Sequence, residues 1–223
     1  PLGMGEIGCF CPPSTSVVSG NDPRNGKPYV NQLFLGHTAG GAVAYQDAWL
    51  TMLHAGNGGM CFIDSVELDE VYTPIIVKTR RLIPDSEGAG RFRGAPGIEV
   101  ELGPVNCRME AGFVADGNIN IPKGARGGGD AARSDQFRRR KSGKMERLDQ
   151  CSQVWIEDGE MMLSIACGGG GYGNPKARDP ERVLHDVEEG LVSRKRARKI
   201  YGVAITAANK IDLRKTKELR RRK

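Results

Sequence analysis

The sequence feature that most constrains the fold is a run of four glycines, residues 168–171, with a fifth at Gly173. Glycine has no β-carbon, so this run permits positive φ angles and lets a ligand or another backbone come very close. Orphan N–H groups at a strand-to-helix turn attract anions, and phosphate binding is therefore one interpretation. No Lys-Ser or Lys-Thr pair follows the glycines, which favours the other interpretation, a tight structural crossing.

The segments on either side of the glycines indicate what the run connects. Residues 153–156 and 161–166 are apolar and β-branched and flank the turn 157–160, so we predict a β-hairpin that leads into the run. Asp179 and Pro180 follow it and are typical of a helix N-cap and the first helical position. The glycines therefore join a strand to a helix.

The middle of the chain is expected to be mostly β-structure. Its apolar segments are short, β-branched and separated by glycine-rich corners. The sequence around residues 42–54 fits one or two helical turns as well as it fits a loop. The predicted strands cover residues 30–35, 72–83, 98–102, 107–114 and 119–121.

The C-terminal segment changes to helical patterning. Val183 and Val187 share one helical stripe, Gly190 is placed to end that helix, Ser193 can cap a second one, and Gly202 can stop it. A helical hairpin with so few apolar side chains must dock on a larger surface. We therefore predict an α+β fold, mainly antiparallel β with glycine-rich loops and a C-terminal helical hairpin.

Composition along the chain suggests three parts. Residues 1–30 are rich in Gly, Pro, Ser and Asn and are expected to form an extended arm, residues 31–205 a folded domain, and residues 206–223 a disordered basic tail. Residues 1–3 resemble a protease-cleavage scar, so the native chain is expected to begin at Met4.

Charge and hydropathy exclude several classes of protein. The formal net charge of +6 comes largely from residues 138–144 and the tail, with few aromatic side chains between the basic ones, so nucleic-acid binding is not favoured. No apolar run reaches the roughly 18 residues of a membrane span and no signal peptide is visible, which predicts a cytoplasmic protein. The cysteines, scattered without zinc-ligand spacing, are expected to be reduced thiols: Cys9, Cys11, Cys61, Cys107, Cys151 and Cys167.

Two histidines lie beside glycine clusters. Together with the carboxylates of Asp47 and Asp64, His37 and His54 could ligate a catalytic metal with an open position. No fixed spacing supports this interpretation, and the alternative is that each histidine hydrogen-bonds neighbouring backbone.

Two longer motifs carry a resemblance to a known family. Residues 78–99 read KTRRLIPDSEGAGRFRGAPGIE, and residues 168–175 and 179–187 read GGGGYGNP and DPERVLHDV. Together with residues 190–193 and 201–203, they resemble the hydantoinase B family, which includes subunits of N-methylhydantoinase, 5-oxoprolinase, caprolactamase and the acetone and acetophenone carboxylases. Family members are much longer, and the resemblance covers only their C-terminal part.

The resemblance implies a division of labour between subunits. A partner of the hydantoinase A (HyuA) type would bind ATP and phosphorylate an amide or enol oxygen, and a chain corresponding to the N-terminal half of hydantoinase B would hold a divalent metal, Zn, Mn or Mg. No metal ligand can be carried onto a numbered residue of this chain. The chain would then be a subunit of an ATP-dependent cyclic-amide hydrolase or ketone carboxylase, inactive alone.

Candidate site residues follow from the same resemblance. His37 and Arg80 are catalytic candidates, and Gly168, Gly169, Gly170 and Gly171 are candidates for binding substrate or phosphate. Arg80 fits a solvated strand face equally well. The alternative function is a structural or assembly subunit of such a complex, without chemistry of its own.

Overall fold

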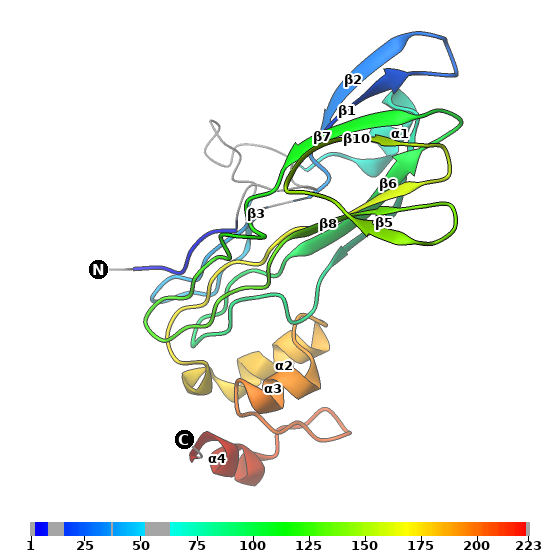
Figure 1. The fold of residues 1–223 in the computed structure, drawn as a ribbon. Coiled ribbons are helices and arrows are strands. Elements are labelled where there is room, and N and C mark those ends of the chain that lie inside the picture. The colour runs from blue at the N-terminus through cyan, green and yellow to red at the C-terminus, as the bar shows by residue number, and fades with distance from the viewer. Residues whose placement is uncertain (1–2, 9–15, 37, 52–62, 222–223) are drawn as a thin grey trace.

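In the computed structural model, two antiparallel β-sheets lie next to a set of extended loops, and a group of helices lies at the far side of those loops (Figure 1). The structure describes residues 3–8, 16–36, 38–51 and 63–221. The first sheet has the strand order β10 (Cys151–Ile156), β7 (Met109–Val114), β1 (Ser16–Asn21), β2 (Pro28–Leu33). The second has the order β5 (Ile75–Leu82), β6 (Ile98–Pro104), β11 (Met161–Ile165), β8 (Asp135–Arg139), β9 (Met145–Arg147). A short pair joins β3 (Thr38–Ala39) to β4 (Leu50–Thr51).

The main hydrophobic core lies between these two sheets. Val18 and Met109 of the first sheet and Val100 and Met162 of the second are almost fully buried in one cluster. Alternate residues of each strand point to the same face, so each sheet can give one face to this core. The predicted α+β fold, mainly antiparallel β with a C-terminal helical hairpin, is confirmed.

The predicted hairpin before the glycine run is wrong, although both of its strands exist. β10 pairs with β7 in the first sheet, whereas β11 pairs with β6 and β8 in the second. Ile156 and Met162, on either side of the turn, are both buried in the core between the sheets. The turn therefore carries the chain from one sheet to the other, because that arrangement buries both apolar residues.

Two further strand expectations differ from the structure. Residues 119–121 form no strand; the Ile119 N–H donates to the Asp116 carbonyl at 3.0 Å in a turn. Strand β6 was expected to be half-buried, but both of its faces are largely covered. Glu101 on its second face is buried beside Arg139, at 2.8 Å.

Helix α1 (Val66–Tyr72) was not predicted, although its start carries a clear signal. The Ser65 hydroxyl accepts a hydrogen bond from the Leu68 N–H, as an N-cap does. The helix packs on β5 and buries Asp69, whose Oδ2 has no hydrogen-bond partner within the described chain. Burial raises the pKa of Asp69 to about 6, and the negative charge of Asp64 adds to this effect.

The raised pKa of Asp69 predicts a pH-dependent stability. The carboxyl is protonated more easily in the folded than in the unfolded chain, so the fold is penalised as the pH rises through about 6. Asp69→Asn should raise the melting temperature at pH 8 by about 3–6 °C, for a free energy on the order of 1–2 kcal/mol. At a pH near the pKa of this carboxyl in the unfolded chain, the gain in melting temperature should vanish. Thermal unfolding at both pH values checks this, and an equal gain at both would contradict it.

The C-terminal helices match the predicted hairpin. α2 (Pro180–Glu188) begins at the N-cap Asp179, and α3 (Arg194–Lys199) begins at the N-cap Ser193, whose hydroxyl accepts from the Arg196 N–H. A short 3-10 turn, η1 (Pro175–Ala177), precedes them. Gly190, with φ +71°, separates α2 from α3, so the predicted C-terminal stop is observed.

The last part of the chain differs from the disordered tail expected over residues 206–223. It contains helix α4 (Leu213–Arg221), and the Asp212 carboxylate accepts from the Lys215 N–H at the start of this helix. The buried hydroxyl of Thr216 accepts from the Ala204 N–H, and Arg220 donates to the carbonyl of Arg178. Most of the basic residues of this helix are exposed, but the contacts of Thr216 and Arg220 hold it against the chain before it.

The expected arm over residues 1–30 also contains regular structure. β1 lies inside the first sheet, between β2 and β7, and its Val18 is fully buried in the core. β2 runs across the expected boundary at residue 30. The apolar pair Val17–Val18 was too short to indicate a strand in the sequence, and the sheet supplies the partner strands.

Candidate functional site

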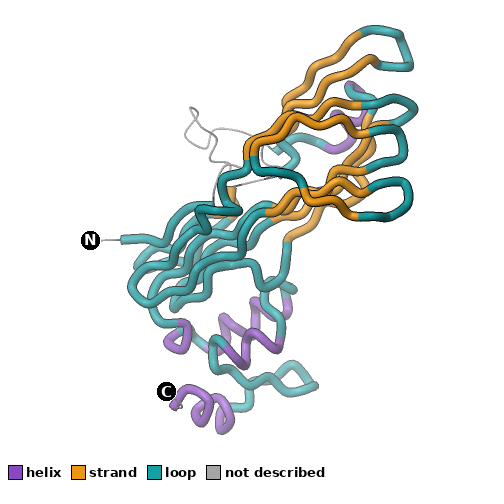
Figure 2. The backbone as a smooth tube through the Cα atoms, in the orientation of Figure 1, coloured by secondary structure: helices purple, strands orange, loops and turns teal. Residues whose placement is uncertain are grey.

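The glycine run lies inside a bundle of extended segments outside the two large sheets. Figure 2 shows these segments as loops that run side by side between the strands and the C-terminal helices. We call them the glycine bundle, because backbone hydrogen bonds join the segments directly: residues 5–8, 39–43, 86–97, 122–132 and 166–173.

Each glycine of the run donates its N–H to a different part of the bundle. Gly168 donates to Ala132, Gly169 to Ala95 at 3.0 Å, Gly170 to Glu6 at 2.8 Å and Gly171 to Gly129 at 3.0 Å. These donors are therefore satisfied within the chain in this structure. A substrate- or phosphate-binding role for the four glycines stays a prediction, and it would require some of these bonds to open.

Close approach, not positive φ, explains why glycine occupies these positions. Of the five glycines over residues 168–173, only Gly173 has a positive φ, at +73°. A β-carbon on Gly169 would lie 1.9 Å from the Gly40 carbonyl oxygen, and one on Gly170 would lie 2.1 Å from the Lys123 carbonyl oxygen. The run is thus the centre of a packed structure in which backbone contacts backbone.

The predicted catalytic residues are His37 and Arg80. His37 lies outside the described residues, as do His54 and Cys61. Arg80 is exposed on β5, where its Nη1 donates to the Asp64 carbonyl at 3.2 Å. A catalytic role for either residue stays a prediction.

The carboxylates considered as metal ligands are engaged in other contacts. Asp47 accepts from Arg178 and from the Arg93 N–H, and Asp64 accepts from the Phe34 N–H at 2.7 Å. Among the described residues, no group of three or more His, Cys, Asp or Glu side chains is arranged to hold a metal ion. That part of the chain therefore does not fit the metal that the resemblance implies, and the metal stays assigned to a partner chain as a prediction.

A buried ion-pair network fastens the bundle to helix α2, and sequence analysis missed it. The Arg178 guanidinium donates to both oxygens of Asp47, at 2.6 and 2.8 Å, and to Asp186 Oδ2 at 2.8 Å. Arg93 Nε donates to Asp186 Oδ1 at 2.8 Å. Burial raises the pKa of Asp47, but the Arg178 guanidinium and the Arg93 N–H outweigh that effect and hold the pKa below its usual range.

The basic block at residues 138–141 is also paired with carboxylates. Arg138 and Arg140 contact Glu146 at 2.8 and 2.9 Å, and the Lys141 ammonium lies 3.8 Å from Asp158. Hydrogen bonds from Arg140 and Arg138 lower the pKa of Glu146 to about 2. The block is therefore part of the β8–β9 hairpin and its surroundings, with its charge largely compensated.

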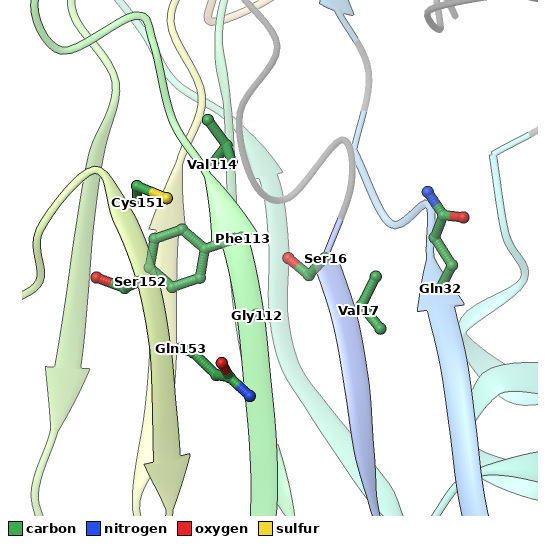
Figure 3. Close-up of a pocket in the computed structure, with 9 residues that line it drawn as sticks. All are labelled: Ser16, Val17, Gln32, Gly112, Phe113, Val114, Cys151, Ser152 and Gln153. Atoms are coloured by element: carbon green, nitrogen blue, oxygen red, sulfur yellow. The ribbon is translucent and has the colours of Figure 1, made fainter.

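A cavity lies on the first sheet, at one end of its strands (Figure 3). It has a volume of about 590 Å³ and lining residues without a formal charge: Ser16, Val17, Gln32, Gly112, Phe113, Val114, Cys151, Ser152 and Gln153. Gln32, Val17, Gly112 and Gln153 are paired in register across all four strands, so they form one row on the face opposite the core. If Gly112 had a β-carbon, the nearest atom to it would be 3.9 Å away, so the space above this row is open.

The same face of the sheet exposes further apolar side chains. Val17, Val30, Val114 and Trp155 are each at least two-fifths exposed, and Arg108 lies 4.4 Å over the Trp155 ring. We call this surface the outer face of the first sheet. Large contiguous apolar patches are uncommon on monomers and often mark a site of protein–protein contact.

Comparisons with known proteins agree on one family. The profile of the hydantoinase B/oxoprolinase family matches residues 8–175. Caprolactamase subunit beta of Pseudomonas jessenii is 31% identical over 201 residues, which cover 87% of this chain and 35% of that protein. Acetone carboxylase alpha subunit of Xanthobacter autotrophicus is 24% identical over 63% of this chain and 22% of the relative.

A solved structure shows the same arrangement. The crystal structure of ATP-dependent caprolactamase from Pseudomonas jessenii superposes with a TM-score of 0.85 at 28% identity, over 97% of this chain and 38% of that chain. The chain therefore spans about a third of the length of the caprolactamase subunit that it matches. No helix among the described residues is long and apolar enough to cross a membrane.

Proposed function

The chain belongs to the hydantoinase B/oxoprolinase family, and on this premise we propose that it is a subunit of an ATP-dependent enzyme complex that hydrolyses a cyclic amide or carboxylates a ketone. The observation that carries the proposal is the match to caprolactamase subunit beta in sequence and structure over nearly the whole of this chain, but only about a third of the relative. In this proposal, a partner chain completes the hydantoinase B-type active site.

In this proposal the chemistry is shared among polypeptides. A hydantoinase A-type partner binds ATP and activates the amide or enol oxygen by phosphorylation, and phosphate is a far better leaving group than the unmodified oxygen. A second partner, equivalent to the rest of hydantoinase B, supplies the divalent metal. This chain supplies a rigid wall built on the glycine bundle, with His37 and Arg80 as catalytic candidates.

The proposed contact with the metal-bearing partner is the outer face of the first sheet. Its row of uncharged residues and its exposed Val17, Val30 and Trp155 suit an apolar protein surface. In the caprolactamase structure, nearly two thirds of the chain lies outside the part that is equivalent to this one.

Co-expression tests the proposal. We expect the chain to form a complex with a hydantoinase A-type ATPase and a chain that carries the rest of hydantoinase B. Only when ATP is present should this complex consume caprolactam, hydantoin or 5-oxoproline, or acetone with bicarbonate. The isolated chain should show no turnover with any of these. Turnover by the isolated chain would overturn the subunit proposal.

A charge on the outer face should prevent that assembly. Val17→Asp is expected to weaken co-purification at least tenfold, because an unpaired carboxylate would be buried in the contact. Ile119→Asp, on an exposed turn outside the strands of this sheet, is the matched control. Both variants should unfold at temperatures close to wild type, and equal co-purification of the two would rule out this surface.

An assembly role without chemistry is the second candidate function. It is favoured by the N–H groups of residues 168–171, which are all donated to carbonyls of the chain itself. A complex that assembles with this chain, and keeps full activity when Arg80 is replaced by Gln, would support the assembly role and remove Arg80 from the catalytic candidates.

A further inference from the structure

A second cavity opens next to the ion-pair network, between helix α2 and the loop before β4. Its volume is about 340 Å³, and charged or aromatic side chains dominate its lining: Asp47, Trp49, Arg93, Arg178, Arg182 and His185. It shares no lining residue with the apolar cavity on the first sheet. Its chemistry therefore has to be considered separately.

Positive charge exceeds negative charge around this cavity. Three guanidinium groups, those of Arg93, Arg178 and Arg182, face two carboxylates, Asp47 and Asp186. Arg178 donates hydrogen bonds to both carboxylates, so the excess positive charge lies on Arg93 and Arg182. A low-dielectric wall strengthens the attraction of such an excess for an anion.

Arg93 and Arg182 each have N–H groups that donate no hydrogen bond to a carboxylate within the described chain. Arg93 Nε donates to Asp186 and Nη1 donates to the Gly94 carbonyl at 3.3 Å, whereas Nη2 makes no hydrogen bond within the described chain. Its side chain is only 6% exposed, so that donor is directed by the packing around it. The Arg182 Nη1 lies 3.7 Å from Asp47 Oδ2, beyond hydrogen-bond length, and half of this side chain is exposed.

We propose that this cavity binds a small oxyanion, a phosphate or a carboxylate group, between Arg93 and Arg182. Guanidinium groups donate pairs of hydrogen bonds to such anions, and the bonds are short and charge-assisted. An anion would accept a hydrogen bond from Arg93 Nη2, which makes none within the described chain. His185 and the exposed Trp49 lie at the cavity and would complete its lining.

Ligand titration of the full chain tests this proposal without any partner. Inorganic phosphate and acetate, added at low salt, should each be followed by calorimetry and by the fluorescence of Trp49, with Trp155 as the second, distant indole. Phosphate should bind with a Kd of about 1 mM, which corresponds to about −4 kcal/mol. The ratio of the two affinities assigns the preferred oxyanion.

Two arginine variants give the titration its control. Arg182→Gln should weaken phosphate binding at least tenfold, whereas Arg133→Gln, which removes the same charge from another exposed position, should leave it unchanged. Both sites are exposed, so thermal unfolding should confirm intact folding. The proposal is overturned if neither phosphate nor acetate binds at tens of millimolar, or if the two variants bind the anion equally. Either result would leave the proposed complex untouched, because the titration needs no second chain.

Discussion

Gly169→Ala is expected to unfold the protein or to lower its melting temperature by about 6–12 °C. The new β-carbon would lie 1.9 Å from the Gly40 carbonyl oxygen and 2.5 Å from its carbon, and neither backbone atom can rotate away. Overpacking of a core usually costs about 1–3 kcal/mol, and the upper end or more applies where the backbone itself must move. Soluble yield and thermal unfolding of the variant measure this cost.

Gly112→Ala is the matched control for that prediction. Gly112 lies in strand β7, where the nearest atom to an added β-carbon would be 3.9 Å away, and its φ is not positive. Alanine there should change the melting temperature by no more than about 2 °C. If Gly169→Ala behaves like this control, close backbone packing does not explain the glycine run.

Asp186→Asn is expected to cost about 3–5 kcal/mol, a fall of about 6–20 °C in melting temperature. Asp186 is 2% exposed and pairs with Arg178, which is 1% exposed, and with Arg93. Removing its charge leaves two buried guanidiniums with one carboxylate, and Asn can accept only part of the hydrogen bonds that it replaces. Thermal or denaturant unfolding at neutral pH gives the value.

The control for the ion-pair prediction is an exposed pair of similar length. Asp135 contacts Arg147 at 2.7 Å, but half of the Arg147 side chain is exposed. Surface pairs of this kind contribute about 0–1 kcal/mol, so Asp135→Asn should unfold close to wild type. Equal losses for Asp135→Asn and Asp186→Asn would show that burial does not set the strength of the network.

Local signals were enough to place most of the regular structure. The Asp179–Pro180 start of α2, the Ser193 cap of α3 and the Gly190 stop between them were all visible, because capping depends on side chains within a few residues. β5, β6 and β7 followed from β-branched patterning in the same way. Helix α4 was missed because its many basic residues hid the Asp212 start signal and its single buried contact, Thr216.

The candidate site was predicted less completely than the fold. The glycine run was recognised as a place of close approach, but the identity of the approaching backbone was not. The Arg178–Asp47 pair joins residues 131 positions apart, and nothing in the sequence near Asp47 indicates an arginine partner. The cavity beside this pair was missed for the same reason.

The amino-acid sequence by itself determined where many of the strands, the α2–α3 hairpin and the glycine-rich corners lie, and it determined the family to which the chain belongs. Tertiary structure alone decided that β10 and β11 belong to different sheets, that residues 168–171 give their N–H groups to other segments, and that an excess of guanidinium groups gathers beside α2. The physical reason is the distance along the chain over which each kind of interaction acts. Backbone preference and capping act over a few residues, whereas burial, close backbone contact and ion pairing depend on which distant segment lies opposite.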